Sequence, residues 1–165
     1  MKLVNRAILF AFFITKGQLW AHCQVPCGIY DDALRIVQMR EDFRTIQKAM
    51  DQIIHLKGKT SAQDMNQCIR WVHTKEEHAV RIQETVSTYF LIQRIKAKTT
   101  TQGEAYNAYV QQTTNLHQVM VAAMKCKQTV AINYVQEGLI LLDDFVNLYF
   151  DDHGQEHLKA ISGKL

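Results

Sequence analysis

Hydrophobic residues recur with the period of an α-helix, among polar residues, over four long segments of this chain. In the first, roughly residues 31–57, apolar side chains are spaced by three and four: Ile36, Met39, Phe43, Ile46, Met50 and Ile53. This spacing lines one face of an α-helix. Asp31 or Asp32 is suited to cap the start of this helix, and Gly58 is suited to end it.

The second segment is predicted to start at Ser61, with Asp64 three residues later in a capping-box-like arrangement, and to continue to about Lys96. Its apolar line contains one cation and runs through Cys68, Val72, Lys75, Ala79, Ile82, Val86 and Tyr89. The next break in the pattern is Thr99-Thr100-Thr101-Gln102-Gly103.

The last two segments are shorter. The third runs from Glu104 to about Lys125, with a line through Tyr106, Val110, Thr113, His117, Met120 and Met124. The fourth runs from about Thr129 to Asp151, is closed by Gly154, and has its line through Ile132, Val135, Leu139, Leu142, Val146 and Tyr149. Four amphipathic segments with short connections predict an all-α fold, an antiparallel four-helix bundle.

Composition agrees with one folded domain. The chain has 165 residues, of which 47% are hydrophobic, with seven glycines and one proline. This length supports a hydrophobic core, and the composition excludes collagen and low-complexity linkers. No apolar run reaches the roughly 18 residues that a membrane-spanning helix needs, which excludes a polytopic membrane protein.

The net charge of +3 comes entirely from the first 21 residues. That stretch contains Lys2, Arg6 and Lys16 and no acidic residue, so residues 22–165 hold sixteen basic and sixteen acidic side chains. A neutral domain lacks the basic surface of a nucleic-acid-binding protein. We therefore expect no nucleic-acid partner.

Residues 1–21 are typical of a leader or signal peptide. Two basic residues precede an apolar run from Ala7 to Ile14, and the small residue Ala21 follows. We expect a maturation protease to remove this segment after Ala21, leaving a domain of residues 22–165 without a membrane segment. The protein is then exported to the periplasm or outside the cell if the leader is a true signal peptide, and otherwise cytoplasmic after proteolytic maturation.

Residues 22–30, HCQVPCGIY, concentrate the metal-binding chemistry and are called the hook below. Thiolate and imidazole are metal ligands, and Pro-Cys-Gly favours a turn that brings both sulfurs to one ion. If His22 is the mature N-terminus, its amine, the Cys23 amide nitrogen and the thiolates of Cys23 and Cys27 form an in-plane N₂S₂ set. The His22 imidazole would lie above this plane. Square-planar N,S ligation favours nickel or copper over zinc.

Other interpretations of the cysteines stay open at this point. Two cysteines spaced by four residues in an exported protein are often joined in a disulfide. A zinc site would require a second pair of ligands at similar spacing. The remaining cysteines, Cys68 and Cys126, do not form such a pair, because each is isolated on a predicted helix. We expect these two to be small buried hydrophobic residues, with a disulfide as the alternative.

The hook, followed by Asp31-Asp32 and a helical domain, closely resembles the N-terminus of the nickel superoxide dismutases, whose pattern is HCxxPCGxY. All six fixed positions are present: His22, Cys23, Pro26, Cys27, Gly28 and Tyr30. The resemblance implies a four-helix bundle assembled as a homohexamer, with one nickel per chain wrapped by the hook. It also implies a processing step that frees the His22 amine. Gln24 stands where some members carry an acid.

The activity that the resemblance implies is conversion of superoxide to oxygen and hydrogen peroxide through a Ni(II)/Ni(III) cycle. Two thiolates and a deprotonated amide donate electrons strongly and bring nickel into the range that this cycle needs. The alternatives are an exported nickel- or copper-binding helical protein without turnover, and a helical interaction protein whose hook cysteines form a disulfide.

Two further residues are site candidates. The Tyr30 hydroxyl, three residues after Cys27, can close the open face of the metal and bind a small oxygen species, a role that the resemblance supports. Lys75 interrupts an apolar line, so it either extends to water or faces the hook, where the family places a basic residue of its second helix. Arg70 is the fallback.

The family's carboxylate partner on the first helix has no clear counterpart. Gln38 and Glu41 are the candidates for that position.

Overall fold

The computed structural model describes residues 30–163, and in that range the chain is helical without strands. The predicted leader and hook positions 22–29 lie outside the described residues. The elements are α1 (Asp32–His55), α2 (Ala62–Glu84), the π-helix η1 (Thr85–Arg94), the 3₁₀ turn η2 (Thr100–Gln102), α3 (Glu104–Gln128), α4 (Asn133–Tyr149) and α5 (Asp152–Ser162). The predicted all-α class is confirmed.

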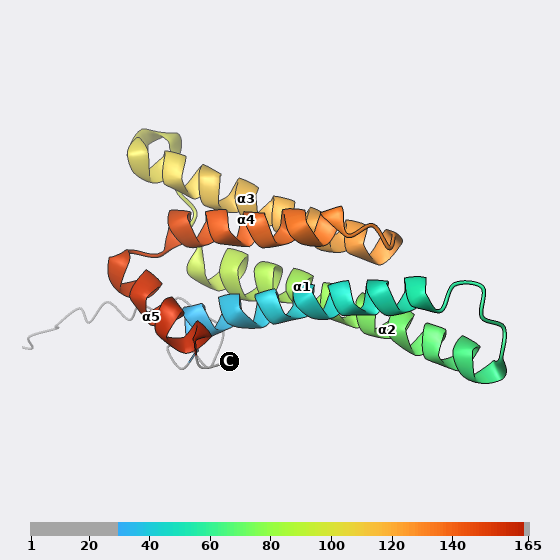
Figure 1. Cartoon of the computed structure of the whole chain (residues 1–165). Helices are drawn as coiled ribbons and strands as arrows, with labels where there is room; N and C mark the ends of the chain where they lie inside the picture. The colour runs from blue at the N-terminus through green and yellow to red at the C-terminus, as the bar shows by residue number, and fades with distance from the viewer. Residues whose placement is uncertain (1–29, 164–165) are drawn as a thin grey trace, which may run out of the picture.

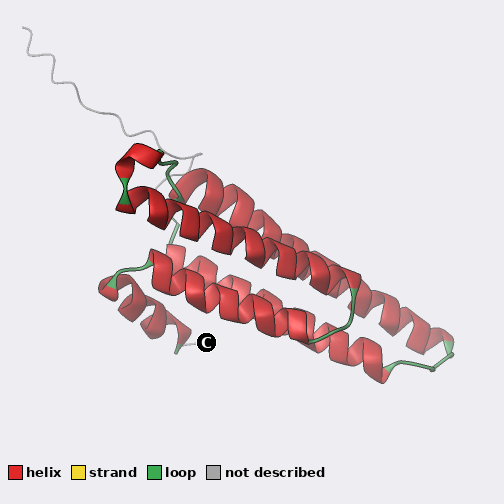
Figure 2. Cartoon of the chain, turned by 90° about the horizontal axis from the view of Figure 1, so that it is seen from above, coloured by secondary structure: helices red, strands yellow, loops and turns green. Residues whose placement is uncertain are grey.

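The long helices form two antiparallel hairpins packed side by side, one made by α1 and α2 and the other by α3 and α4 (Figure 1). Short loops join the helices, and α5 lies beside the first part of α1 (Figure 2). Buried apolar side chains from all four long helices meet between the hairpins. None of the helices within residues 30–163 is both long and apolar enough to cross a membrane.

The predicted caps of the first two helices are confirmed. Asp31 Oδ1 accepts hydrogen bonds from the backbone N–H groups of Ala33 and Leu34 at 2.9 and 3.3 Å. Ser61 Oγ accepts from the N–H of Asp64 at 3.1 Å. These side chains satisfy backbone donors that the first turn of a helix leaves unpaired. Gly58 follows α1 with a φ of 79°, a conformation that glycine adopts without strain.

The fourth helix ends at Tyr149, close to the predicted end near Asp151, but the prediction that Gly154 closes it is wrong. The chain becomes extended at Phe150, and a separate helix, α5, begins at Asp152. The reason is local, because Asp151 Oδ1 accepts a hydrogen bond from the N–H of Gly154 at 2.8 Å and so caps a new helix. The glycine lies in the first turn of α5, and Leu158 buries that helix against the core.

The predicted apolar line of the third helix is also wrong. His117 and Met124 on that line are exposed, whereas the buried face of α3 consists of Asn115, Leu116, Val119, Ala122, Ala123 and Cys126. Apolar residues occur on both sides of this helix, so periodicity alone does not choose between them. Tertiary packing selects the face that carries Leu116, Val119 and the small side chains of Ala122 and Ala123.

Gly138 in α4 allows a close contact with α1. A Cβ atom placed there would lie 2.3 Å from Cζ of Phe43, a side chain that is fully buried. We expect Gly138→Ala to destabilise the fold by about 1–3 kcal/mol through overpacking, although alanine favours helix formation by up to about 1 kcal/mol. Urea unfolding measures the change. Gly163→Ala, where the new Cβ makes an ordinary 3.5 Å contact, is the matched control.

Candidate functional site

Tyr30 is the hook residue that the structure describes, and it packs where α1 begins and η1 ends. Its ring lies 6.0 Å from that of Tyr89 in an edge-on arrangement, with the Arg35 guanidinium 4.7 Å from the Tyr30 ring centroid. A guanidinium nitrogen of Arg94 donates to the Tyr30 carbonyl at 3.2 Å. The side chain keeps 39% of its surface exposed. Tyr30 is thus held through its ring and backbone while still reaching solvent.

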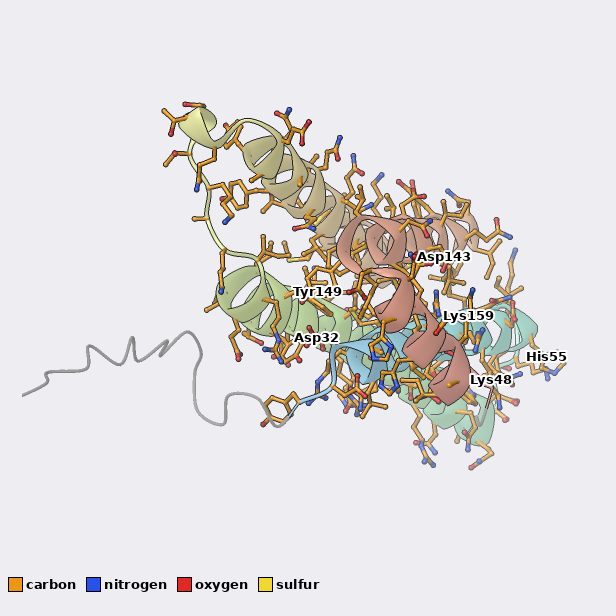
Figure 3. The ribbon with its side chains drawn as sticks, turned by 90° about the vertical axis from the view of Figure 1, so that its left-hand side faces the viewer. Asp32, Lys48, His55, Asp143, Tyr149 and Lys159 are labelled. Carbon is orange, nitrogen blue, oxygen red and sulfur yellow. The ribbon has the colours of Figure 1, made fainter. Side chains whose placement is uncertain are left out.

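Asp32 is the centre of a hydrogen-bond network beside Tyr30. The hydroxyl of Tyr149 donates to Asp32 Oδ2 at 2.7 Å, and that of Tyr89 donates to Oδ1. Arg94 Nε forms an ion pair with Oδ1 at 2.8 Å, and another Arg94 nitrogen donates to the Tyr89 hydroxyl at 2.8 Å. Figure 3 shows Asp32 and Tyr149 next to each other at this end of the bundle. The carboxylate therefore joins α1, η1 and α4 where the hook enters the fold.

Both phenols remain proton donors over the physiological range. Burial raises the pKa of Tyr89 to about 12, the hydrogen bond to Asp32 adds to this rise, and the bond from Arg94 opposes it. Burial and the bond to Asp32 also raise the pKa of Tyr149. Since neither hydroxyl ionises near neutral pH, the network keeps its donors.

The π-helical segment η1 continues α2 and turns two adjacent residues, Tyr89 and Phe90, toward the interior beside Asp32. Tyr89 is 6% exposed and the next residue, Phe90, is fully buried. The wider turn ends with the N–H of Ile95 donating to the Phe90 carbonyl at 2.8 Å, an i→i+5 bond. Phe90 then packs edge-on against the rings of Phe145 and Tyr149, at centroid distances of 5.1 and 5.7 Å. Such π-helical turns are frequent at functional sites.

A polar groove of about 960 Å³ runs from Tyr30 along α1 and α2. His78 Nδ1 and Asp42 Oδ1 are hydrogen-bonded across it at 2.6 Å. Burial raises the pKa of the Asp42 carboxyl, while the bond to His78 opposes the rise. Gln38 and Glu41, the candidates for a helix-one partner, both line this groove. The groove adjoins the described end of the hook at Tyr30.

Lys75 is buried, with 4% of its surface exposed, so the expectation that it extends to water is wrong. Its ammonium group donates to the carbonyl of Cys126 at 2.8 Å and to that of Lys127, and pairs with Glu76 at 3.1 Å. These carbonyls end α3, where a cation is favourable.

The structure does not bring Lys75 and Tyr30 together. Fourteen residues separate Lys75 from Tyr89, the neighbour of Tyr30, which is about 20 Å along a helix. Arg70 is exposed and lies farther from Tyr89 along the same helix. The predicted role of Lys75 toward the hook metal stays a prediction, since hook positions 22–29 are outside the described residues.

The predicted metal ligands His22, Cys23 and Cys27 are likewise outside the described residues. Within residues 30–163, no three His, Cys, Asp or Glu side chains lie close enough to hold a metal ion together. Cys68 and Cys126 are both free thiols, and Cys126 is fully buried. Burial raises the pKa of the Cys126 thiol to about 11, which makes it unreactive at neutral pH.

The sequence pattern does not indicate the side chains that hold Tyr30. The sequence pattern indicates Asp32 only as a helix cap, and Tyr89 and Tyr149 only as members of apolar lines. Arg35 and Arg94 carry no visible signal at all. Two of the predicted apolar lines end in a tyrosine, Tyr89 and Tyr149, and the first helix starts with the carboxylate of Asp32. This combination of hydroxyl groups and a carboxylate at helix ends is the pattern that could have indicated the network.

Comparison with known protein families identifies the family of this chain. The family model described as nickel-containing superoxide dismutase matches residues 18–153, more than four fifths of the chain, including the hook and all of α1–α4. No curated protein and no solved structure matches the chain.

The Asp32 network makes a measurable prediction. We expect Asp32→Asn to destabilise the fold by about 1–3 kcal/mol, because it removes the charge that the partly buried donors of Tyr89, Arg94 and Tyr149 face. It should also lower the pKa of Tyr89 from about 12 toward 10, with burial keeping the pKa above 10. Urea unfolding and NMR titration of the tyrosine rings measure both effects, and Asp51→Asn, at an exposed position of α1, is the control.

The pH dependence follows from the same pKa. A phenol with a raised pKa holds its proton more tightly in the folded state, so Tyr89 contributes stability that is complete below pH 10 and is lost toward pH 12. This alkaline loss should be smaller in Asp32→Asn. An unchanged Tyr89 pKa in that variant would contradict the network.

Proposed function

The chain belongs to the nickel-containing superoxide dismutase family, and we propose that it converts superoxide to oxygen and hydrogen peroxide. The observation that carries the proposal is the family match, which spans both the hook and the helices α1–α4. The six fixed hook positions, all present, lie within the matched range and supply the metal-binding side chains that the activity needs. Family membership indicates an oxidoreductase, and the specific turnover is what the experiments below test.

The donor set of the hook fits nickel. Cys23 and Cys27 offer thiolates, and His22 offers an amine and an imidazole once residues 1–21 are removed, so we propose one nickel per chain at these residues. When bound, nickel supplies the one-electron change between adjacent oxidation states that disproportionation requires. The amine ligand requires cleavage after Ala21, so maturation by a protease is part of the proposal. Export through a signal peptide is the expected route, with cytoplasmic maturation as the alternative.

Tyr30 is proposed to close the access path to the metal and to hydrogen-bond the small oxygen species there. The contacts of Tyr30 support this role, because Arg94 donates to its carbonyl and Arg35 and Tyr89 flank its ring. The mature domain is neutral overall, so attraction for the superoxide anion has to be local. Arg35 places a positive charge beside Tyr30 and can provide this attraction, whereas the charge of Arg94 is balanced by Asp32.

The assembly and the catalytic turnover are separate proposals with separate support. The homohexamer rests on the family resemblance. The second candidate function, an exported nickel- or copper-binding protein without turnover, uses the same hook ligands, and metal content together with a dismutase assay separates the two.

The first prediction concerns the mature N-terminus. A chain that starts at His22 should bind one nickel and dismutate superoxide, whereas the same chain with Ala21 retained should keep its helical fold and lose activity. The added residue removes the free amine from the ligand set. Metal analysis, circular dichroism and a dismutase assay test this. Full activity with Ala21 retained would contradict the proposal that the His22 amine is a metal ligand.

Substitution of the thiolates tests the ligand set itself. Cys23→Ser and Cys27→Ser should each abolish activity, with loss of nickel from the redox-active geometry. Cys68→Ser, at a free thiol on α2, should leave both unchanged and serves as the control. Normal activity in both hook variants would mean that the hook is not the active site.

The next prediction concerns the cations. We expect Arg35→Gln to lower the second-order rate constant several-fold at low ionic strength and to weaken its salt dependence, with nickel content unchanged. Arg35→Lys should retain much of both, and Arg70→Gln, at an exposed position, should change neither. Stopped-flow measurement over a range of salt concentrations gives the values.

Lys75→Gln is measured in the same series. A lower rate with weaker salt dependence would support its predicted electrostatic role toward the hook. A lower stability with an unchanged rate would assign Lys75 to the α3 terminus alone.

A further inference from the structure

Three tyrosines at the Tyr30 end of the bundle are linked by a series of aromatic contacts. The Tyr30 ring lies 6.0 Å from that of Tyr89, between ring centroids. Tyr89 lies 5.1 Å from Phe90, and Phe90 lies 5.7 Å from Tyr149, both in edge-on arrangements. The Tyr30 side chain reaches solvent, whereas Tyr89 is buried and Tyr149 is half-buried. The four rings therefore form a continuous path from the hook junction into the bundle.

The hydroxyl groups of the two inner tyrosines share one proton acceptor. Tyr149 donates to Asp32 Oδ2 at 2.7 Å, and Tyr89 donates to Oδ1. A phenol that loses an electron becomes strongly acidic, so its oxidation at neutral pH needs a base that takes the proton. A carboxylate already held in a charge-assisted hydrogen bond is such a base, and the transfer requires no movement of the rings. Asp32 therefore makes these phenols easier to oxidise than a tyrosine whose hydroxyl has no acceptor.

Arg94 makes the two phenols unequal. It donates to the Tyr89 hydroxyl at 2.8 Å and pairs with Asp32 Oδ1 at 2.8 Å. A positive charge at this distance opposes removal of an electron from Tyr89 and weakens Oδ1 as a base. Tyr149 binds the other carboxylate oxygen, and within residues 30–163 its hydroxyl has no hydrogen bond from an arginine. Of the two phenols, Tyr149 is therefore the easier to oxidise.

We propose that Tyr149 is a redox-active tyrosine, which gives up an electron along the ring path to a one-electron oxidant at the Tyr30 end. The electron reduces the oxidant, the phenol proton moves to Asp32 Oδ2, and a neutral phenoxyl radical remains on Tyr149. A small reductant from solution, a thiol or an ascorbate, then returns one electron through Tyr30. Asp32 returns the proton, which restores the phenol and the carboxylate.

The path gives the hook thiolates protection from oxidation. Cys27 precedes Tyr30 by three residues, and a thiolate is readily oxidised to products that are in part irreversible. A strong one-electron oxidant formed at the hook takes its electron from Tyr149 instead, and the radical is held between helices. The source of the oxidant rests on the proposed function. The oxidation of Tyr149 itself does not, so it can be tested with an added oxidant.

A second tyrosine pair offers an internal comparison. The rings of Tyr106 and Tyr109 on α3 lie 6.3 Å apart, and both side chains are half-buried, as that of Tyr149 is. Within residues 30–163, neither hydroxyl donates to a carboxylate. Ring contact and burial are thus similar at the two places, whereas the proton acceptor is present at Tyr149 and not at Tyr106.

The first experiment generates the oxidant by light in the full chain, freed of metal with a chelator. Flash photolysis with ruthenium(II) tris-bipyridine and a cobalt(III) quencher, followed by freezing, should give the electron paramagnetic resonance signal of a neutral tyrosyl radical. Tyr149→Phe should lower the persistent signal several-fold, because it removes the hydroxyl and keeps the ring. Tyr106→Phe, the matched control, should leave it unchanged. An unchanged signal in Tyr149→Phe, or a wild type without a tyrosyl signal, would overturn the proposal.

A second experiment tests Asp32 as the proton acceptor. In the wild type the rate of radical formation should not depend on buffer concentration, because the proton moves to Asp32. In Asp32→Asn the proton has to leave to the buffer, so the rate should fall several-fold and rise with buffer concentration, whereas Asp51→Asn should behave as the wild type. Circular dichroism melting checks that the variants are folded. A rate that depends on buffer in the wild type would reject Asp32 as acceptor, whether or not Asp32→Asn folds. Since no nickel is present, a failure of the proposed dismutase activity would change neither result.

Discussion

The structure depends most on the carboxylate of Asp32, which receives donors from three separate helical positions. Tyr89 and Arg94 belong to η1 and Tyr149 to α4, and Arg94 binds both Asp32 and the backbone of Tyr30. A partly buried charge is stable only when such donors surround it, so the position of each donor is tied to the others. The consequence is functional, because the last residue of a nine-residue hook is fixed directly to the helices of the bundle.

The two ends of the bundle have different physical characters. Near Tyr30, aromatic rings and cations surround a fixed carboxylate, and a polar groove with the His78–Asp42 pair extends from there. At the other end, α3 stops and α2 exposes the apolar side chains of Met65, Ile69 and Val72. The described end of the hook therefore lies at the polar, charged end of the bundle.

Much of the fold could be predicted from the sequence because helical spacing and capping residues act locally. The caps at Asp31 and Ser61 and the apolar face of α1 are examples, and the hook motif by itself indicates the family. The buried face of α3 could not be predicted, since apolar residues lie on both sides of that helix and tertiary packing selects between them. The start of α5 depends on a single cap, Asp151. The Asp32 network joins residues up to 117 positions apart, which no local pattern reveals.

Lys75 shows how a break in an apolar pattern can set the architecture instead of the chemistry. A hydrophobic residue there would let the α2–α3 seam continue, whereas the ammonium group needs acceptors and finds them in the carbonyls that end α3. Lys75 thus connects α2 to the C-terminal end of α3. The residue that interrupts the predicted apolar line therefore contributes to the packing of two helices, with its charge placed at the end of α3 where a cation is favourable.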